Sequence, residues 1–334
     1  MAMRCFWLDR CRLHKQEVFD TLPKAELENM ASPNPLRAKG KGLSGVLNIA
    51  HRGARAFAPE NTLAAFEKAK IFACPMFEID VHMSRDGELI VHHDDELTRC
   101  TDVIVKFPGR NSYYLSDFTA DELSALDAGR WYVEQLSLPA KRRLGYLQSL
   151  TDKEVEAFIS REDMDLYGSG EIKLPTLKQT LQLALSLDLM VNIELKTLPR
   201  MYPGMSDAVV ALVETLAMEH RVLISSFDHQ QLQQVRQRSE SIATGVLSTD
   251  RMVNVGVYLS LLDADAFNPG MDSLGYNSVQ GKLDTESIQN AREVGCDVNV
   301  WTCNNKKPMR QLIAAGVTGL ISDYPNRVRE VLEE

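Results

Sequence analysis

The chain has 334 residues, of which 44% are hydrophobic and 25% are charged, and this composition is typical of a globular protein with a large buried core. Its formal net charge of −9 argues against nucleic acid or an anionic membrane as a default partner, although a local phosphate site needs only a few cations. The charged N-terminus lacks the apolar core of a signal peptide, and no apolar run approaches the roughly 20 residues of a membrane span, so we expect a cytoplasmic protein.

The cysteines are scattered along the chain, with no CxxC pair and no Cys/His spacing of the zinc type. Isolated, mostly apolar-flanked cysteines are typical of a reducing compartment, where disulfides are rare. We therefore expect no disulfide among the six: Cys5, Cys11, Cys74, Cys100, Cys296 and Cys303.

Residues 1–45 predict an N-terminal extension with a linker. The pattern over 1–30 predicts an amphipathic, partly helical segment, and 32–45 is rich in Pro, Gly and Lys without any periodicity. A packing arm and a partner-binding helix are the two interpretations of the extension.

After the linker, short apolar strands begin to alternate with helices. The apolar run at 46–51 predicts a strand, and 59–72 predicts a helix with Asn61 as its N-cap. Further strands are expected at 76–83 and 88–94, which an Asp-Gly turn separates.

The same alternation continues to the C-terminus. Helices are expected at 176–188, 206–220, 228–239, 285–295, 306–317 and 327–334. Strands are expected between them, at 190–196, 222–227, 242–248, 297–303 and 319–325.

Helices that alternate with short apolar strands indicate βα units and a parallel sheet. The strand count is near eight and charged residues stand at the C-terminal ends, which predicts a closed (β/α)₈ TIM barrel over residues 46–334, with its active site at that face. A doubly wound open sheet is the alternative, but no GxGxxG motif follows any strand.

The alternation fails between about residues 98 and 174. This stretch is too long for an ordinary connection, so it predicts an inserted subdomain after the third short strand. We expect the insertion to lie over the barrel mouth, where it would cap or shape the pocket.

Three carboxylates stand inside the predicted strands. Glu78 and Asp80 are two positions apart and so share one face, as do Glu194 and Lys196. Carboxylates that converge from two strands provide the oxygen-rich site that Mg²⁺ or Ca²⁺ prefers, and are a poor choice for structural zinc. Solvated surface acids are the alternative interpretation of these residues.

Two histidine positions supply candidates for acid–base chemistry. His51 ends its strand, and the neighbouring Arg52 can reach a phosphate oxygen. His92 and His93 are adjacent and project to opposite faces, so only one can enter the site, and His93 is chosen because it directly precedes Asp94. Asp94 either orients His93 or bonds only to backbone, and each histidine alone could be a satisfied polar residue.

Other polar and aromatic residues have two interpretations each. Glu60 is either a partner of Arg52 or an acidic residue near a helix N-terminus. Phe227 and Trp301 could line the substrate pocket, although aromatic residues of strands more often belong to the core.

An ordered set of motifs resembles the glycerophosphodiester phosphodiesterase family from about residue 46 to residue 334. The motifs, in order, are HRG, PENT, FEIDVHMSRDGELIVHHD, ELTRCTD, LPTL, NIELK, SSFD, VNVWT and ISDYP. Departures from the family pattern are modest: His82 and His92 stand where other residues are common, and 267–276 fits the sixth strand loosely.

The resemblance implies a TIM barrel that hydrolyses glycerophosphodiesters to glycerol 3-phosphate and an alcohol with the help of a divalent cation. It also implies roles for single residues: Glu78, Asp80 and Glu194 as metal ligands, His51 and His93 as general base and acid, and Arg52 and Lys196 as phosphate-binding groups. The attacking group is either water or the substrate's own glycerol hydroxyl. The expected partner is thus a small-molecule phosphodiester.

Two other functions remain open at this point. A lysophospholipase D-type enzyme would use the same site on a lipid, with an apolar entrance that residues 113–118 could provide. A non-catalytic barrel that binds phosphorylated metabolites is the second, although a binder has no need of paired acid–base groups.

Overall fold

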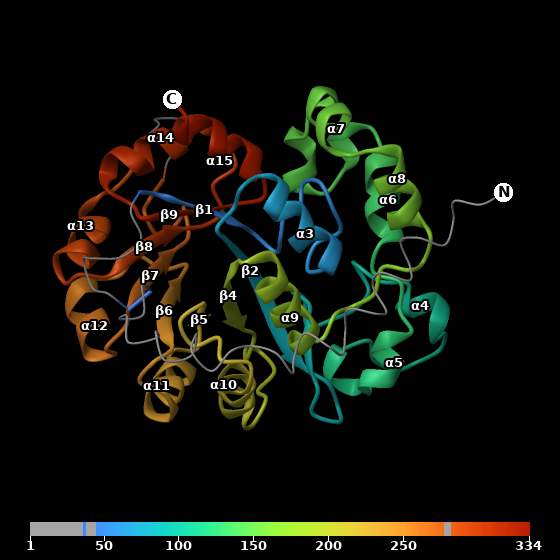
Figure 1. Ribbon diagram of the computed structural model, residues 1–334, viewed down its shortest axis with the longest axis horizontal. Coiled ribbons are helices and arrows are strands. Elements are labelled where there is room, and N and C mark those ends of the chain that lie inside the picture. The colour runs from blue at the N-terminus through green and yellow to red at the C-terminus, as the bar shows by residue number, and fades with distance from the viewer. Residues whose placement is uncertain (1–35, 38–44, 277–281) are drawn as a thin grey trace.

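A closed ring of parallel strands, surrounded by helices, forms the centre of the computed structural model, which describes residues 36–37, 45–276 and 282–334 (Figure 1). The predicted (β/α)₈ TIM barrel is therefore confirmed. The predicted extension and linker at 1–45 lie outside the described residues, apart from positions 36, 37 and 45.

The eight parallel strands of the described part follow one another around the ring. They are β1 (Leu47–Ala50), β2 (Met76–Met83), β4 (Met190–Leu195), β5 (Val222–Ser226), β6 (Ala243–Ser248), β7 (Ala266–Pro269), β8 (Asp297–Val300) and β9 (Gly319–Ser322). Each pairs with the next, and β1 closes the ring by pairing with both β2 and β9.

The third strand in the chain stands outside this ring. β3 (Leu89–Val91) pairs antiparallel with the C-terminal end of β2, and Val81 faces Val91 in that register. The strand predicted at 88–94 is therefore shorter than expected. Because it ends at Val91, His92 and His93 belong to the loop that follows β3.

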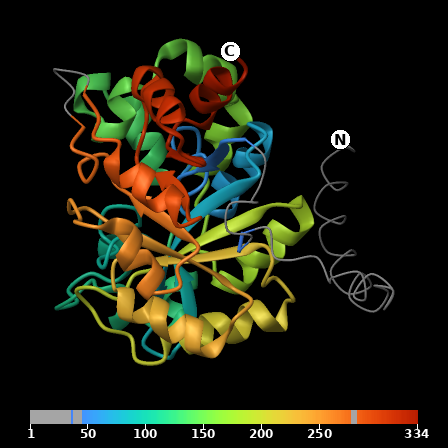
Figure 2. The ribbon, with the colours of Figure 1, turned by 90° about the vertical axis from the view of Figure 1, so that its left-hand side faces the viewer.

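The outer layer of the barrel consists of helices, which the side view in Figure 2 shows on both flanks of the strands. They are α3 (Leu63–Ile71), α9 (Leu177–Leu187), α10 (Met205–Thr215), α11 (His229–Arg238), α12 (Val255–Leu261), α13 (Glu286–Glu293), α14 (Lys306–Ala315) and α15 (Pro325–Leu332). Most match the predicted helices, whereas α12 was not predicted at all. Within the described part, no helix is both long and apolar enough to span a membrane.

Inward-facing apolar side chains fill the N-terminal end of the barrel, and inward-facing polar side chains lie at the C-terminal end. Ile49, Met76, Leu223 and Ile321 form part of this buried cluster. Because side chains two apart on a strand share a face, the inward residues that follow them are polar. These are His51, Glu78, Ser225 and Asp323.

The inserted segment at about 98–174 consists of short helices. They are α4 (Val103–Lys106), α5 (Ala120–Ser124), α6 (Arg130–Ser137), α7 (Asp152–Phe158) and α8 (Arg161–Gly168). Capping boxes begin α5, α7 and α8, so local sequence sets where these helices start.

Figure 1 shows α7 and α8 beside α3 and α15. Ion pairs join these elements: Lys68 contacts Asp163 at 2.6 Å, and Arg327 contacts Glu154 at 2.7 Å. The insertion thus lies against the helices that flank β1. The four cysteines of the described residues are buried and form no disulfide, as expected for that part of the chain: Cys74, Cys100, Cys296 and Cys303.

Candidate active site

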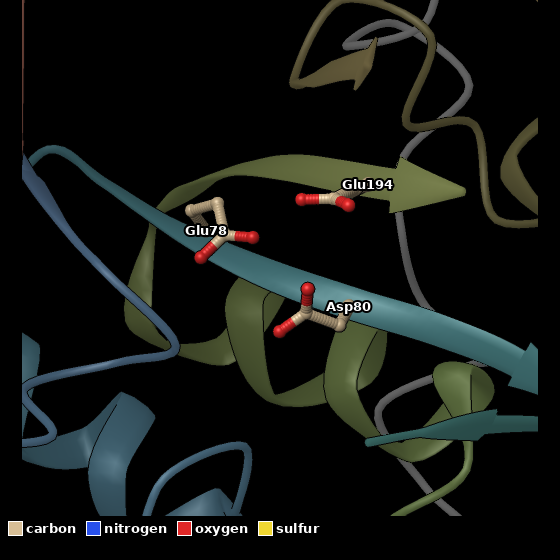
Figure 3. Close-up of side chains that lie close together, drawn as sticks. All are labelled: Glu78, Asp80 and Glu194. Carbon is tan, nitrogen blue, oxygen red and sulfur yellow. The ribbon is translucent and has the colours of Figure 1, made fainter. Parts of the chain in front are cut away.

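Three carboxylates converge from two neighbouring strands. Asp80 of β2 and Glu194 of β4 are register partners, and Glu78 precedes Asp80 by two positions on the same face. One oxygen from each carboxylate lies within 4.8 Å of the others, and all three side chains are buried. Figure 3 shows these carboxylates gathered between the two strands. The grouping that the alternation pattern predicted is present.

Burial and nearby charges shift the pKa values of two of the clustered carboxylates in opposite directions. Burial, together with the charges of Asp80 and Glu194, raises the pKa of Glu78 well above its usual value. Burial also disfavours ionised Asp80, but the charges of His93, Arg52 and Lys196 outweigh it and lower the pKa of Asp80. In the described part, Oε1 of Glu78 is buried without a hydrogen-bond partner.

Two cations border the cluster. Lys196, the first residue after β4, places Nζ 2.8 Å from Oε1 of Glu194 and 3.6 Å from Oδ1 of Asp80. Arg52 donates its backbone N–H to Oε2 of Glu78 at 2.9 Å. Its guanidinium lies 3.4 Å from Oδ2 of Asp80. Both residues expected to bind phosphate therefore lie at the carboxylates.

His51 is the first residue after β1, and a carboxylate contacts the Nδ1 side of its ring. Its Nδ1 is 2.7 Å from Oδ1 of Asp323, and its Nε2 is 3.9 Å from Oε2 of Glu78. Burial and the charge of Arg55 outweigh the effect of Asp323 and lower the pKa of His51 to about 4. His51 is therefore neutral near pH 7, with Nδ1–H donated to Asp323 and Nε2 unprotonated.

The side chains of His92 and His93 have different environments. The Nδ1 of His93 lies 2.5 Å from Oδ1 of Asp94, and the side chain is partly exposed. His92 is buried, and its Nε2 lies 3.3 Å from the carbonyl oxygen of Glu96. Asp94 thus contacts the His93 ring itself, which favours the orienting interpretation over bonding to backbone alone.

Glu60 is a partner of Arg52, with Oε1 accepting a hydrogen bond from Nη1 at 2.8 Å. The helix after it begins at Leu63, and its N-cap is Thr62, whose hydroxyl accepts from the N–H of Ala65. The prediction of Asn61 as N-cap was therefore wrong. Asn61 instead adopts a φ of 55° and donates to Oδ2 of Asp80 at 2.8 Å, because that turn aims its amide at β2.

The two candidate aromatic residues contact each other. Phe227 directly follows β5 and Trp301 directly follows β8, and their rings meet edge to face with centroids 5.6 Å apart. The indole N–H of Trp301 donates to the carbonyl of Asn268 at 2.8 Å. Both aromatics stand at the same end of the barrel as His51, the first residue after β1.

Sequence reasoning missed three charged residues of this site: Arg55, Arg99 and Asp323. Asp323 stands directly after β9 within the ISDYP motif, so its position at a strand end was a signal that could have been used. Arg55 and Arg99 lie in loops, where no periodicity indicates which way a side chain points.

Comparison with known proteins identifies the family of this chain. Residues 51–327 match the model of the glycerophosphoryl diester phosphodiesterase family. A glycerophosphodiester phosphodiesterase of Caldanaerobacter subterraneus is 28% identical over 279 residues, which is 84% of this chain and 94% of that protein. One from Bacillus subtilis is 28% identical over 313 residues, covering 91% of this chain and 93% of that protein.

Solved structures share the fold. An Oleispira antarctica phosphodiesterase, solved with the product sn-glycerol-3-phosphate, aligns with a TM-score of 0.64 and 24% identity over 86% of this chain and 96% of that one. That likeness concerns the barrel, whereas the match over 51–327 identifies the family. The chain belongs to the glycerophosphoryl diester phosphodiesterase family, whose members are phosphoric diester hydrolases.

Proposed function

We propose that the chain hydrolyses glycerophosphodiesters to glycerol 3-phosphate and an alcohol, with paired histidines as acid and base. One observation carries the proposal: a three-carboxylate cluster, two cations and the His51 imidazole lie together at the C-terminal end of the barrel. The charge of His93 helps to lower the pKa of Asp80, and this effect supports a second imidazole near the same carboxylates. An anionic diester needs this combination of charge neutralisation and proton transfer.

The carboxylate cluster fits a hard divalent cation, Mg²⁺ or Ca²⁺. Glu78, Asp80 and Glu194 offer only oxygen donors, and the unpartnered Oε1 of Glu78 is a free donor atom in the described part. Burial and the charges of Asp80 and Glu194 raise the pKa of Glu78, and a positive ion would relieve the repulsion among the three carboxylates. When bound, such a cation would act as a Lewis acid on a phosphoryl oxygen.

His51 suits the role of general base. Asp323 accepts a hydrogen bond from Nδ1–H, so Nε2 carries the lone pair on the side of Glu78. From there His51 would accept the proton of the attacking hydroxyl, whether that hydroxyl belongs to water or to the glycerol of the substrate. A positioned base of this kind typically contributes roughly 10²–10⁴ in rate.

His93 suits the role of general acid. Its Nδ1 is engaged by Asp94, so Nε2 is the ring atom left to donate a proton to the leaving alkoxide. Arg52 and Lys196 would hold the phosphate oxygens, because both place cationic nitrogens beside Asp80. Phe227 and Trp301 would form one wall of the pocket for the glycerol or its headgroup.

A lysophospholipid is the second candidate substrate, and one observation favours it. Leu198 and Met201 are 54% and 60% exposed in the loop that directly follows Lys196. Exposed apolar side chains beside a site are suited to contact with an acyl chain. The two candidates share one mechanism and differ only in the substrate.

A headgroup panel tests the proposal. Glycerophosphocholine, glycerophosphoethanolamine and lysophosphatidylcholine are each incubated with the protein, with and without chelator. Coupled assays detect glycerol 3-phosphate from the first two substrates and free choline from lysophosphatidylcholine, whose other product is lysophosphatidic acid. Chelator-sensitive release from the water-soluble diesters supports the proposal. Turnover of lysophosphatidylcholine alone would move it to the second candidate, and ligand binding without turnover in Mg²⁺, Ca²⁺ or Mn²⁺ would indicate a non-catalytic barrel.

A further inference from the structure

A chain of hydrogen-bonded and ion-paired side chains begins at His51 and leads away from the carboxylate cluster. Asp323 accepts a hydrogen bond from Nδ1–H of His51 and also pairs with the guanidinium of Arg55, whose Nη2 lies 3.1 Å from Oδ2. The same Arg55 donates from Nη1 to Oε2 of Glu60 at 3.4 Å. All four residues are buried. The base candidate is therefore linked to Glu60 through three successive contacts, one hydrogen bond and two ion pairs.

A second chain begins at His93 and ends at the same glutamate. Asp94 contacts Nδ1 of His93 and binds Arg99 in bidentate fashion, at 2.5 Å through Nε and 3.0 Å through Nη2. Arg99 also donates from Nη2 to Oε1 of Glu60 at 2.7 Å. Glu60 is thus the point where the supports of both imidazoles meet.

The inserted segment supplies part of this network. Arg99 stands at the start of the insertion at about 98–174. Tyr146, from the middle of the same insertion, covers the guanidinium of Arg55 with its ring at 4.1 Å. Burial disfavours ionised Glu60, but Arg52, Arg55 and Arg99 outweigh it and hold the pKa of Glu60 well below its usual value.

We propose that the inserted segment positions both imidazoles at once, with Arg99 as the positioning residue that bridges Glu60 and Asp94. This inference rests on the proposed function, because it presupposes the acid and base roles of His51 and His93. The planar guanidinium fixes Asp94 through two parallel hydrogen bonds, which sets the direction of the His93 ring. Its bond to Glu60 fixes that carboxylate against Arg55, and so the support of His51.

The role of Arg99 predicts a specific kinetic signature. Replacing it with Ala (Arg99→Ala) frees Asp94 and removes one of the three cations around Glu60. We expect kcat to fall roughly 10–100-fold, as for other residues that orient the groups in direct contact with a ligand. KM should change less than about threefold, because Arg99 contacts Asp94 and Glu60 and is not among the groups proposed to hold the phosphate. Arg99→Lys should restore only part of kcat, since an ammonium cannot make the bidentate contact.

Guanidinium rescue separates positioning from a merely structural role. Arg99 is partly exposed, so millimolar guanidinium can enter the space that Arg99→Ala leaves. The proposal predicts that added guanidinium raises the kcat of Arg99→Ala several-fold and leaves the wild type unchanged. Arg85→Ala is the matched control, because Arg85 is an exposed arginine that pairs with Glu122 at 3.7 Å. That variant should keep the wild-type kcat and show no rescue.

A double variant tests whether the network acts as one unit. If Arg55 and Arg99 both act through Glu60, Arg55→Lys combined with Arg99→Lys should lose less kcat than the product of the two single losses. Multiplicative losses, or an Arg99→Ala enzyme with wild-type kcat, would overturn the proposal. If Arg99→Ala fails to fold, the Lys variants decide the question. A wild type without diesterase activity would refute the proposed function itself, which is a different outcome.

Discussion

The imidazole of His51 and the carboxylate of Asp323 meet at 2.7 Å although 272 positions of the chain separate them. Each is the first residue after a barrel strand, His51 after β1 and Asp323 after β9, and these strands pair side by side. Closure of the barrel therefore brings the first strand of the ring to the last and assembles this pair.

Replacing Asp323 with Asn (Asp323→Asn) should lower kcat roughly 10²–10⁴-fold, because an amide no longer secures the proton on Nδ1 of His51. The affinity for a substrate analogue should change little, since Asp323 contacts Nδ1 of His51 and not the Nε2 side that faces the cluster. Steady-state kinetics with circular dichroism as the folding control would check this. Wild-type kcat in a folded Asp323→Asn protein would remove Asp323 from the account.

Removing the divalent cation should abolish turnover and destabilise the protein. Burial and the neighbouring carboxylates raise the pKa of Glu78, and a bound cation would relieve the repulsion among them. Added Mg²⁺ or Ca²⁺ at 100 times Kd should therefore raise the free energy of unfolding by about 2.7 kcal/mol, and the thermal midpoint should rise with it. Glu194→Gln should weaken this shift, whereas Glu88→Gln, at an exposed carboxylate, should not. Equal shifts in both variants would argue against the cluster as the metal site.

The contact between the insertion and α15 should be sensitive to acid. Burial raises the pKa of Glu154, but hydrogen bonds from Arg327, Thr151 and Asn326 outweigh it and lower the pKa to about 2, from a usual value of 4.5. A lowered acid pKa means that its contribution to stability is complete above pH 4.5 and is lost as the pH falls toward 2.

Glu154→Gln tests that contact without losing the helix cap, since Gln also serves in a capping box. We expect a loss of about 1–3 kcal/mol in the free energy of unfolding at pH 7. Urea unfolding at several pH values should show the difference between wild type and variant shrinking below pH 4. A difference that is constant between pH 7 and pH 3 would contradict the assignment.

Much of the fold could be predicted because periodicity reports which side of an element faces inward. Two-residue spacing placed Glu78 and Asp80 on one face, and the parallel alternation put Glu194 beside them. α12 escaped prediction because its apolar residues lie on both faces: Val257 and Leu261 are 72% and 79% exposed, while Leu259 is buried.

The polar supports of the site could not be predicted from periodicity. Arg99 reaches Glu60 across 39 positions, and Arg55 reaches Asp323 across 268. Such contacts depend on how loops fold over the barrel end, and local sequence carries no signal for them. The role of Asn61 could not be predicted for the same reason. Its backbone turns so that the amide donates to Asp80, and Thr62 is the N-cap of the helix.

Side-by-side alanine variants of the two adjacent histidines test the central claim most directly. With glycerophosphocholine and a divalent cation present, His93→Ala should lose roughly 10²–10⁴-fold in kcat. His92→Ala should unfold at a lower temperature yet keep kcat within about threefold of wild type, because His92 is buried against the carbonyl of Glu96. The account is contradicted if a folded His93→Ala enzyme turns over substrate as fast as the wild type.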